Sequence, residues 1–219
     1  VHIQAHGNIV GKPMPSEVAV RTEIPHDNPQ DIYLREGLEA LVGKVSEPLM
    51  IPLGVDTERK HRGLSLPEER HILIAGATGS GKSNFLATVI STLAVINDPS
   101  EVKITLLDPK GIDFGKFQTL PHVETYQDTA NGGVEKLLEL LEDELPERRE
   151  ALRNVGASSV AELNENANEL DVKPIPYHVV VIDEYADLIM STEDQDDFES
   201  AVTRLAQVGR ALGFIILLA

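Results

Sequence analysis

The chain has 219 residues, of which 42% are hydrophobic, and this is enough for one α/β domain with a substantial buried core. Cysteine is absent, which excludes a disulfide framework and a thiolate metal site. The 36 acidic and 19 basic residues give a net charge of −17, so the chain as a whole lacks the basic face of an isolated DNA-binding domain. Any contact with nucleic acid must therefore come from a few loops.

Residues 1–65 are interpreted as an N-terminal accessory segment that packs on the main domain. Four prolines between residues 13 and 29 favour short strands and turns over a long helix. Alternating apolar residues predict a short strand over 18–24. A weak helical pattern covers 31–42, and 48–55 reads as a strand that ends at Gly54.

The main domain, residues 66–219, alternates predicted strands and helices. Strands are expected at 71–75, 102–107, 178–182 and 214–218. Helices are expected at 82–96, 133–153, 158–170 and 196–212, with Pro146 kinking or dividing the second. Apolar strands alternating with helices predict an α/β fold with a mostly parallel sheet flanked by helices. Because the sequence stops directly after the last strand, we expect it to be a C-terminally truncated piece of a longer protein.

The strongest motif lies between the first strand and the first helix of the main domain. It fits the phosphate loop G-x-x-x-x-G-K-[ST], in which backbone N–H groups and a helix N-terminus surround an anion. A chance glycine-rich turn is the alternative, and the flanking strand and helix argue against it. We expect ATP as ligand and these nucleotide-binding residues: Gly76, Ala77, Thr78, Gly79, Ser80, Gly81, Lys82, Ser83 and Asn84. Lys82 would neutralise the β- and γ-phosphates, and the Ser83 hydroxyl would ligate Mg²⁺.

A second motif follows the apolar strand at 178–182. Asp183 and Glu184 come directly after it, so both carboxylates should lie at the carboxyl end of a central strand, where open α/β sheets bind ligands. We expect Asp183 to hold Mg²⁺ through water and Glu184 to deprotonate the attacking water. The alternative is a strand that simply runs out into solvent.

A third group, Asp108-Pro109-Lys110, leaves the strand at 102–107 and should lie at the same edge. Taken alone, an ordinary turn containing Asp-Pro explains it as well.

Together these motifs resemble the FtsK/SpoIIIE family of DNA translocases over about residues 18–219. The phosphate loop, the D-P-K segment and the V-V-V-I-D-E-Y-A-D-L-I-M run resemble family motifs in the family's order, although Asp113 stands where Glu is usual. Further matches lie at Ile32–Arg35, Leu120–Val123, Glu147–Arg149, Gly156, Asn164, Arg204–Gln207, Arg210, Gly213 and Leu218.

The resemblance implies a RecA-like P-loop motor that assembles as a hexameric homo-oligomer around double-stranded DNA, with ATP between neighbouring subunits. The family continues beyond L-A with T-Q-R-P, a polar sensor near the γ-phosphate, and this sequence ends at Ala219. Hydrolysis by the truncated chain is therefore left open.

Arg210 is our candidate for an arginine finger that acts across the subunit interface, because it lies near the end of the helix expected at 196–212. The alternatives are that it pairs with a carboxylate such as Glu199 or caps the helix C-terminus. For DNA contact, the candidates are Lys110, Lys116 and the segment 190–195, with solvated loops as the alternative.

The leading hypothesis is an ATPase coupled to DNA translocation. The main rival is a protein-export ATPase of the type VII secretion kind, which shares this core, and a third reading is a nucleotide sensor that does not hydrolyse. No run of about 18 apolar residues occurs, so we expect no membrane contact from this sequence. A cytoplasmic location is expected, with membrane anchoring of a longer parent protein left open.

Overall fold

The computed structural model describes residues 32–41, 48–56, 59–77, 79–192 and 195–219. Residues 33–219 form one compact unit. Within this unit Leu49 and Ile51, which precede the predicted domain boundary, belong to the same hydrophobic core as the sheet. The division of the chain at residue 65 stays a prediction. The strand predicted over 18–24 lies outside the described residues.

Five parallel strands form the central sheet. Their order is β3, β7, β6, β4 and β5, with the bounds Ile72–Leu73, Phe214–Leu218, Tyr177–Ile182, Val102–Leu107 and Val123–Gln127. Every residue of β6 is buried, because this strand has neighbours on both sides and helices over both faces. The predicted strands at 102–107 and 214–218 are confirmed at their bounds, whereas β3 is shorter than predicted and β5 had no counterpart in the prediction.

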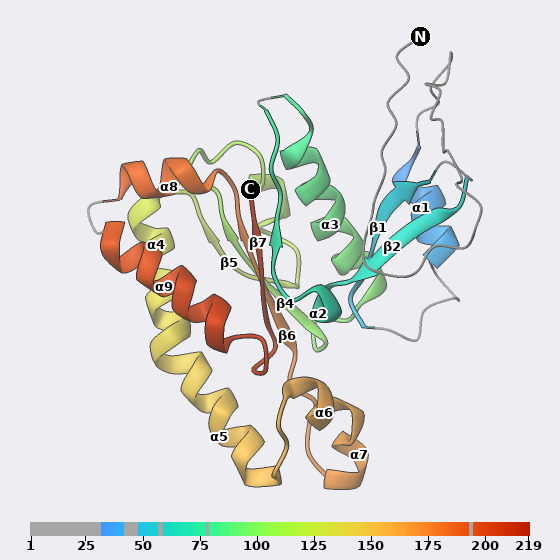
Figure 1. Cartoon of the computed structure of the whole chain (residues 1–219), viewed down its shortest axis with the longest axis vertical. Coiled ribbons are helices and arrows are strands. Elements are labelled where there is room, and N and C mark those ends of the chain that lie inside the picture. The colour runs from blue at the N-terminus through green and yellow to red at the C-terminus, as the bar shows by residue number, and fades with distance from the viewer. Residues whose placement is uncertain (1–31, 42–47, 57–58, 78, 193–194) are drawn as a thin grey trace, which may run out of the picture. The chain divides into compact units, whose positions relative to one another are not determined.

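Helices cover the two faces of the sheet (Figure 1). On one side lies α3 (Lys82–Ile96), which has the predicted bounds and buries Leu86, Val89, Ile90 and Leu93. The other side carries α4 (Ala130–Glu139), α5 (Leu145–Val155), α8 (Tyr185–Ser191) and α9 (Gln195–Val208). The predicted fold, a mostly parallel sheet flanked by helices, is therefore confirmed.

A small hairpin precedes the sheet. The helix α1 (Leu34–Leu41) confirms the weak helical prediction over the residues that are described. β1 (Met50–Val55) pairs antiparallel with β2 (His61–Ser65), and α2 (Leu66–Glu69) follows at once. The predicted strand at 48–55 is thus present, but it runs through Gly54 to Val55, and β2 was not predicted.

Two predicted helices are wrong in detail. The helix predicted at 158–170 is divided into α6 (Val160–Glu165) and α7 (Ala167–Leu170). Asn166 lies at the break, where its φ of −104° and ψ of 9° leave the helical region, and both its backbone N–H and its side-chain amide donate to the carbonyl of Glu162. The late helix ends at Val208 instead of residue 212, because Gly209 begins a turn in which its carbonyl accepts the N–H of Phe214.

The helix predicted at 133–153 keeps its course past Pro146. A single turn of π-helix (the π-turn, Leu140–Glu144) joins α4 to α5 just before the proline, and the ribbon runs on from α4 to α5 in Figure 1. Pro146 lies in the first turn of α5, where the missing N–H does little harm. A short 3₁₀ helix, η1 (Gly115–Phe117), follows β4. Among the helices of the described residues, none combines the length and the apolar character that a membrane span needs.

Candidate functional site

The backbone register brings the three sequence motifs to one edge of the sheet. Leu107 pairs with Ile182, and Ile182 pairs with Leu218. Leu218 in turn pairs with Leu73, at the end of β3. The strands therefore stop at the same level, and the segments that follow them meet at the carboxyl edge, which lies at the top in Figure 1.

The phosphate loop leaves β3 and turns directly into α3. Gly79 and Gly81 have φ values of +77° and +100°, which L residues with a side chain rarely adopt, so the path of the loop requires glycine at these two positions. The loop glycines are exposed, and the ammonium of Lys82 donates to the carbonyl of Gly76 at 3.0 Å. The cation thus already lies against the loop that would surround a phosphate. Thr78 lies outside the described residues.

Asp183 and Glu184 follow β6 in different environments. Asp183 is buried, and its N–H donates to the carbonyl of Leu107 across the sheet. Glu184 has φ +53° and ψ +68°, a left-handed conformation that is uncommon for a residue with a side chain. Strain of this kind is concentrated at functional sites. The turn directs the chain from the buried strand into α8.

The carboxylate of Asp183 lies in a cluster that is short of positive charge. Burial raises its pKa, and the negative charges of Asp113, Asp108 and Glu184 raise it further, to about 6. Lys110 acts in the opposite direction but does not compensate. A bound cation would reverse this balance.

Asp108 shapes the loop after β4. Its side chain is fully buried and accepts backbone N–H bonds from Gly111, Asp113 and Phe114, at 3.0 to 3.1 Å. The turn therefore depends on this carboxylate, which explains the Asp of the D-P-K segment in structural terms.

The residues at this edge fit a bound Mg²⁺. Ser83 offers a hydroxyl oxygen from the first turn of α3, and Asp183 offers a carboxylate whose pKa is raised by burial and by the carboxylates around it. Hard oxygen ligands of this kind, completed by water and phosphate oxygens, are what Mg²⁺ prefers.

Lys110 bridges the two acidic positions at this edge. Its ammonium nitrogen lies 2.9 Å from Asp187 Oδ2 and 3.5 Å from Glu184 Oε2. Sequence reasoning placed Lys110 at the right edge but missed Asp187. The sequence offered one signal for Asp187. It stands three residues after Glu184, so the two side chains would lie on the same face of a helix, but α8 was not predicted.

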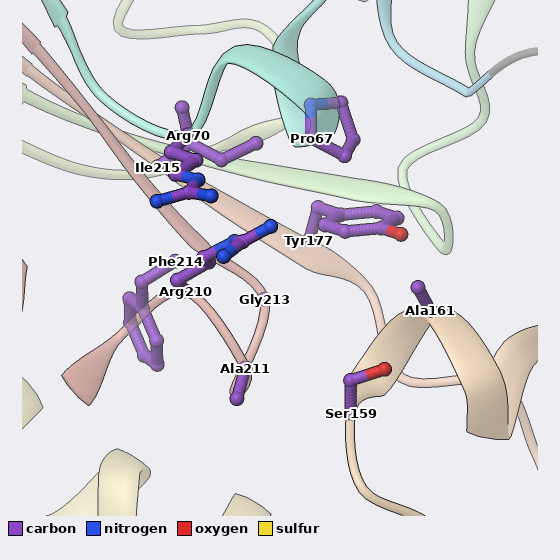
Figure 2. Close-up of a pocket in the computed structure, with 10 residues that line it drawn as sticks. All are labelled: Pro67, Arg70, Ser159, Ala161, Tyr177, Arg210, Ala211, Gly213, Phe214 and Ile215. Carbon is purple, nitrogen blue, oxygen red and sulfur yellow. The ribbon is translucent and has the colours of Figure 1, made fainter.

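Arg210 lies at the other edge of the sheet. It belongs to the turn between α9 and β7, at the lower end of the sheet in Figure 1, and it is outside the helix that was expected to carry it. It lines a pocket of about 320 Å³ with Arg70, Tyr177 and Phe214 (Figure 2). The structure does not bring it to the phosphate loop of its own chain. No ion pair joins its side chain to Glu199 or to any other residue in the described part of the chain.

One group of potential metal ligands lies at this second edge. Glu124, Glu144 and His178 gather there. Arg148 lies 2.6 Å from Glu144, and Lys103 lies 2.8 Å from Glu124, so cations of the protein already neutralise both carboxylates. We interpret this group as a structural network and not as a metal site.

Comparison with known proteins agrees with the geometry. The FtsK/SpoIIIE family matches residues 39–219. The chain belongs to the FtsK/SpoIIIE family. A DNA translocase FtsK from Helicobacter pylori (strain J99) is 35% identical over 208 residues, which cover 94% of this chain and 24% of that protein. The chain thus spans about a quarter of the length of this relative of the FtsK/SpoIIIE family.

Two solved structures are similar in fold. The cytoplasmic domain of the type VII secretion ATPase EccC from Thermomonospora curvata has a TM-score of 0.70 and 26% identity, over 88% of this chain and 23% of that one. The pCW3 conjugation coupling protein TcpA, solved with ATPγS, has a TM-score of 0.66 and 25% identity, over 91% of this chain and 55% of that one. Both likenesses support the predicted P-loop ATPase fold.

Proposed function

We propose that this chain is the ATP-hydrolysing motor domain of a protein that translocates double-stranded DNA. The observation that carries the proposal is the meeting of Lys82, Asp183 and Glu184 at one edge of a parallel sheet. Membership of the FtsK/SpoIIIE family supports it, as does the similar TcpA structure with its ATP analogue. We propose a cytoplasmic location, because both ATP and DNA are available there.

In this proposal the phosphate loop binds the nucleotide. Backbone N–H groups of the glycine-rich turn donate to the phosphate oxygens, and the start of α3 adds its positive end. The ammonium of Lys82 turns from the carbonyl of Gly76 to the β- and γ-phosphates. Ser83 directly and Asp183 through water would hold Mg²⁺, which would supply positive charge to those phosphates.

Glu184 is proposed as the general base. A water oxygen forms a bond to the γ-phosphorus, the bond from that phosphorus to the β–γ bridging oxygen breaks, and the water proton passes to Glu184. The carboxylate is 37% exposed, so water can reach it from the surface. The products are ADP and phosphate.

DNA contact is assigned to the loop after β4. Lys116 is exposed there and lies 5.1 Å from the ring centroid of Phe117, and Lys110 lies beside Glu184 and Asp187. Met190, in the other candidate segment, is also exposed. Reversing the charge at Lys110 and Lys116 should reduce the factor by which DNA stimulates turnover and the salt dependence of that stimulation. Unchanged salt dependence would remove this loop from the DNA interface.

The proposed assembly is a hexameric homo-oligomer in which Arg210 reaches the nucleotide of a neighbouring subunit. Its position away from its own phosphate loop is compatible with action in trans only. Subunits with Arg210→Ala and subunits with Lys82→Ala are mixed. Interfaces that join an intact Lys82 to an intact Arg210 should restore part of the turnover. Rings shown to be mixed but without recovery would contradict the role of Arg210.

A protein-export ATPase is the second candidate, favoured by the likeness to EccC and by the acidic charge of the chain. The two are separated by measuring ATP turnover with duplex DNA and with an export-signal peptide. Stimulation by DNA alone supports the translocase, and stimulation by the peptide alone supports export. Nucleotide binding without turnover under either condition would support a sensor.

A further inference from the structure

Lys110 holds a position between two acidic side chains at the carboxyl edge of the sheet. Its ammonium donates to Asp187 at 2.9 Å and lies 3.5 Å from Glu184. The hydrogen bond to Asp187 raises the pKa of Lys110, and the charges of Asp187 and Glu184 add to this. The group is therefore positively charged at neutral pH. Glu184, the proposed general base, is therefore paired with a cation.

This pairing opposes the proposed chemistry. The ion pair occupies one oxygen of Glu184 and biases the direction of its side chain, so this oxygen is not free to receive the proton of the attacking water. Lys110 therefore restrains Glu184 for as long as the two remain together.

The contact is arranged so that it can open. The side chain of Lys110 is 47% exposed and that of Asp187 is 40% exposed, so the ion pair is solvated and weak. The backbone around Lys110 is held, because the buried Asp108 accepts the N–H groups of Gly111 and Phe114. The root of the lysine side chain is thus fixed, while its flexible four-carbon stem can turn outward.

We propose that Lys110 couples the binding of duplex DNA to ATP hydrolysis. A backbone phosphate draws the ammonium away from Glu184 and leaves the carboxylate free to accept a proton. Phosphate oxygens are the part of DNA that Lys side chains contact most readily. Asp187 competes with Glu184 for the same ammonium and so sets how firmly Glu184 is restrained. The inference rests on the proposed function, in which duplex DNA is the cargo.

Two substitutions should change DNA-independent turnover in opposite directions. Lys110→Met removes the cation, so basal turnover should rise about two- to fivefold, the range expected for a solvated ion pair, and DNA should stimulate little further. Asp187→Asn leaves the ammonium to Glu184 alone, so basal turnover should fall and the factor of stimulation by DNA should grow. The KM for ATP should stay unchanged in both, because neither residue belongs to the phosphate loop.

Lys103→Met is the matched control. Lys103 lies in β4, the strand that precedes the loop with Lys110, and pairs with Glu124 at the opposite edge of the sheet. Its substitution should change neither basal nor DNA-stimulated turnover. Loss of turnover in both variants, or stimulation by DNA retained in Lys110→Met, would overturn the inference. If DNA does not stimulate turnover of the wild type, the proposed cargo is contradicted. Opposite changes of basal turnover in Lys110→Met and Asp187→Asn would then still support the restraint of Glu184 by Lys110. No turnover in the wild type would overturn both proposals.

Discussion

The two edges of the parallel sheet handle buried carboxylates in opposite ways. At the carboxyl edge, burial and three neighbouring carboxylates raise the pKa of Asp183 to about 6. At the amino edge, burial works to raise the pKa of Glu144, but hydrogen bonds from His178 and Arg148 and their positive charges lower it to about 2. The carboxyl edge thus has too few cations to neutralise its carboxylates, whereas the amino edge contains cations that neutralise Glu144.

This difference separates function from stability within one fold. Arg148 donates to Glu144 and to the carbonyl of Leu212, and its guanidinium lies 4.5 Å from the ring centroid of Phe214. The amino edge therefore stabilises the fold with groups that satisfy one another. The carboxyl edge keeps like charges close together, which costs stability and prepares the edge for a cationic ligand.

The largest effect is expected from Glu184→Gln. An amide cannot accept the proton of water, so turnover should fall by about 10²- to 10⁴-fold while ATP still binds. Single-turnover kinetics and fluorescent-nucleotide titration measure the two properties separately. Glu169→Gln, an exposed position in α7, is the control. A mutant of Glu184 that turns over at the wild-type rate would show that another group is the base.

Lys82→Ala should weaken ATP binding next most strongly. The substitution removes charge-assisted hydrogen bonds to the phosphates, so affinity should fall about tenfold to a hundredfold. The titration uses Lys173→Ala, an exposed lysine outside the site, for comparison. If both variants bind ATP as the wild type does, Lys82 has no place in the site.

Glu144→Gln should destabilise the fold at the amino edge of the sheet. Losing the carboxylate leaves Arg148 and His178 without their anionic partner, and the free energy of unfolding should fall by about 3 kcal/mol. Because the folded pKa lies near 2, below the ordinary 4.5, this stabilisation is present above about pH 4.5 and is lost as the pH falls toward 2.

Urea unfolding at pH 7 and at pH 3 tests this prediction. Glu142→Gln, an exposed residue of the same π-turn, is the control and should change stability little at either pH. Equal losses for the two variants would mean that the network contributes nothing beyond a surface charge.

Asp183→Asn should change the free energy of unfolding in the opposite direction to Glu144→Gln, and by less. The folded pKa of about 6 exceeds the ordinary 3.8, so ionisation of Asp183 destabilises the ligand-free fold as the pH rises from about 4 through 6. Removing the charge should therefore raise stability at pH 7 by about 1 to 3 kcal/mol. Stabilisation by Mg²⁺ with ATP should be lost at the same time.

Thermal unfolding without and with Mg²⁺-ATP measures both effects of this substitution, and Asp143→Asn, at an exposed position of the π-turn, is the control. A destabilised Asp183→Asn protein would show that the two edges do not differ in the way proposed here.

Local signals predicted the parts of the fold that depend on local chemistry. The bounds of α3 and of β4 and β7 follow from an apolar pattern bounded by glycine or polar residues. The predictions were weaker where the decisive contact lies elsewhere. β5 is only half-buried, and its residues show no continuous apolar run, so its pairing with β4 was not visible in the pattern. The break at Asn166 interrupts a segment whose apolar pattern continues, so the pattern alone did not reveal it.

The amino-acid sequence by itself determined the phosphate loop, the Asp183–Glu184 pair and the alternation of strands and helices. These features depend on residue types at fixed spacing, where glycine allows the turn and an apolar run requires burial. Only the tertiary structure decided which side chains meet. The register of parallel strands brings Asp108, Asp183 and Lys110 to one edge and leaves Arg210 at the other, because pairing between distant strands sets those positions.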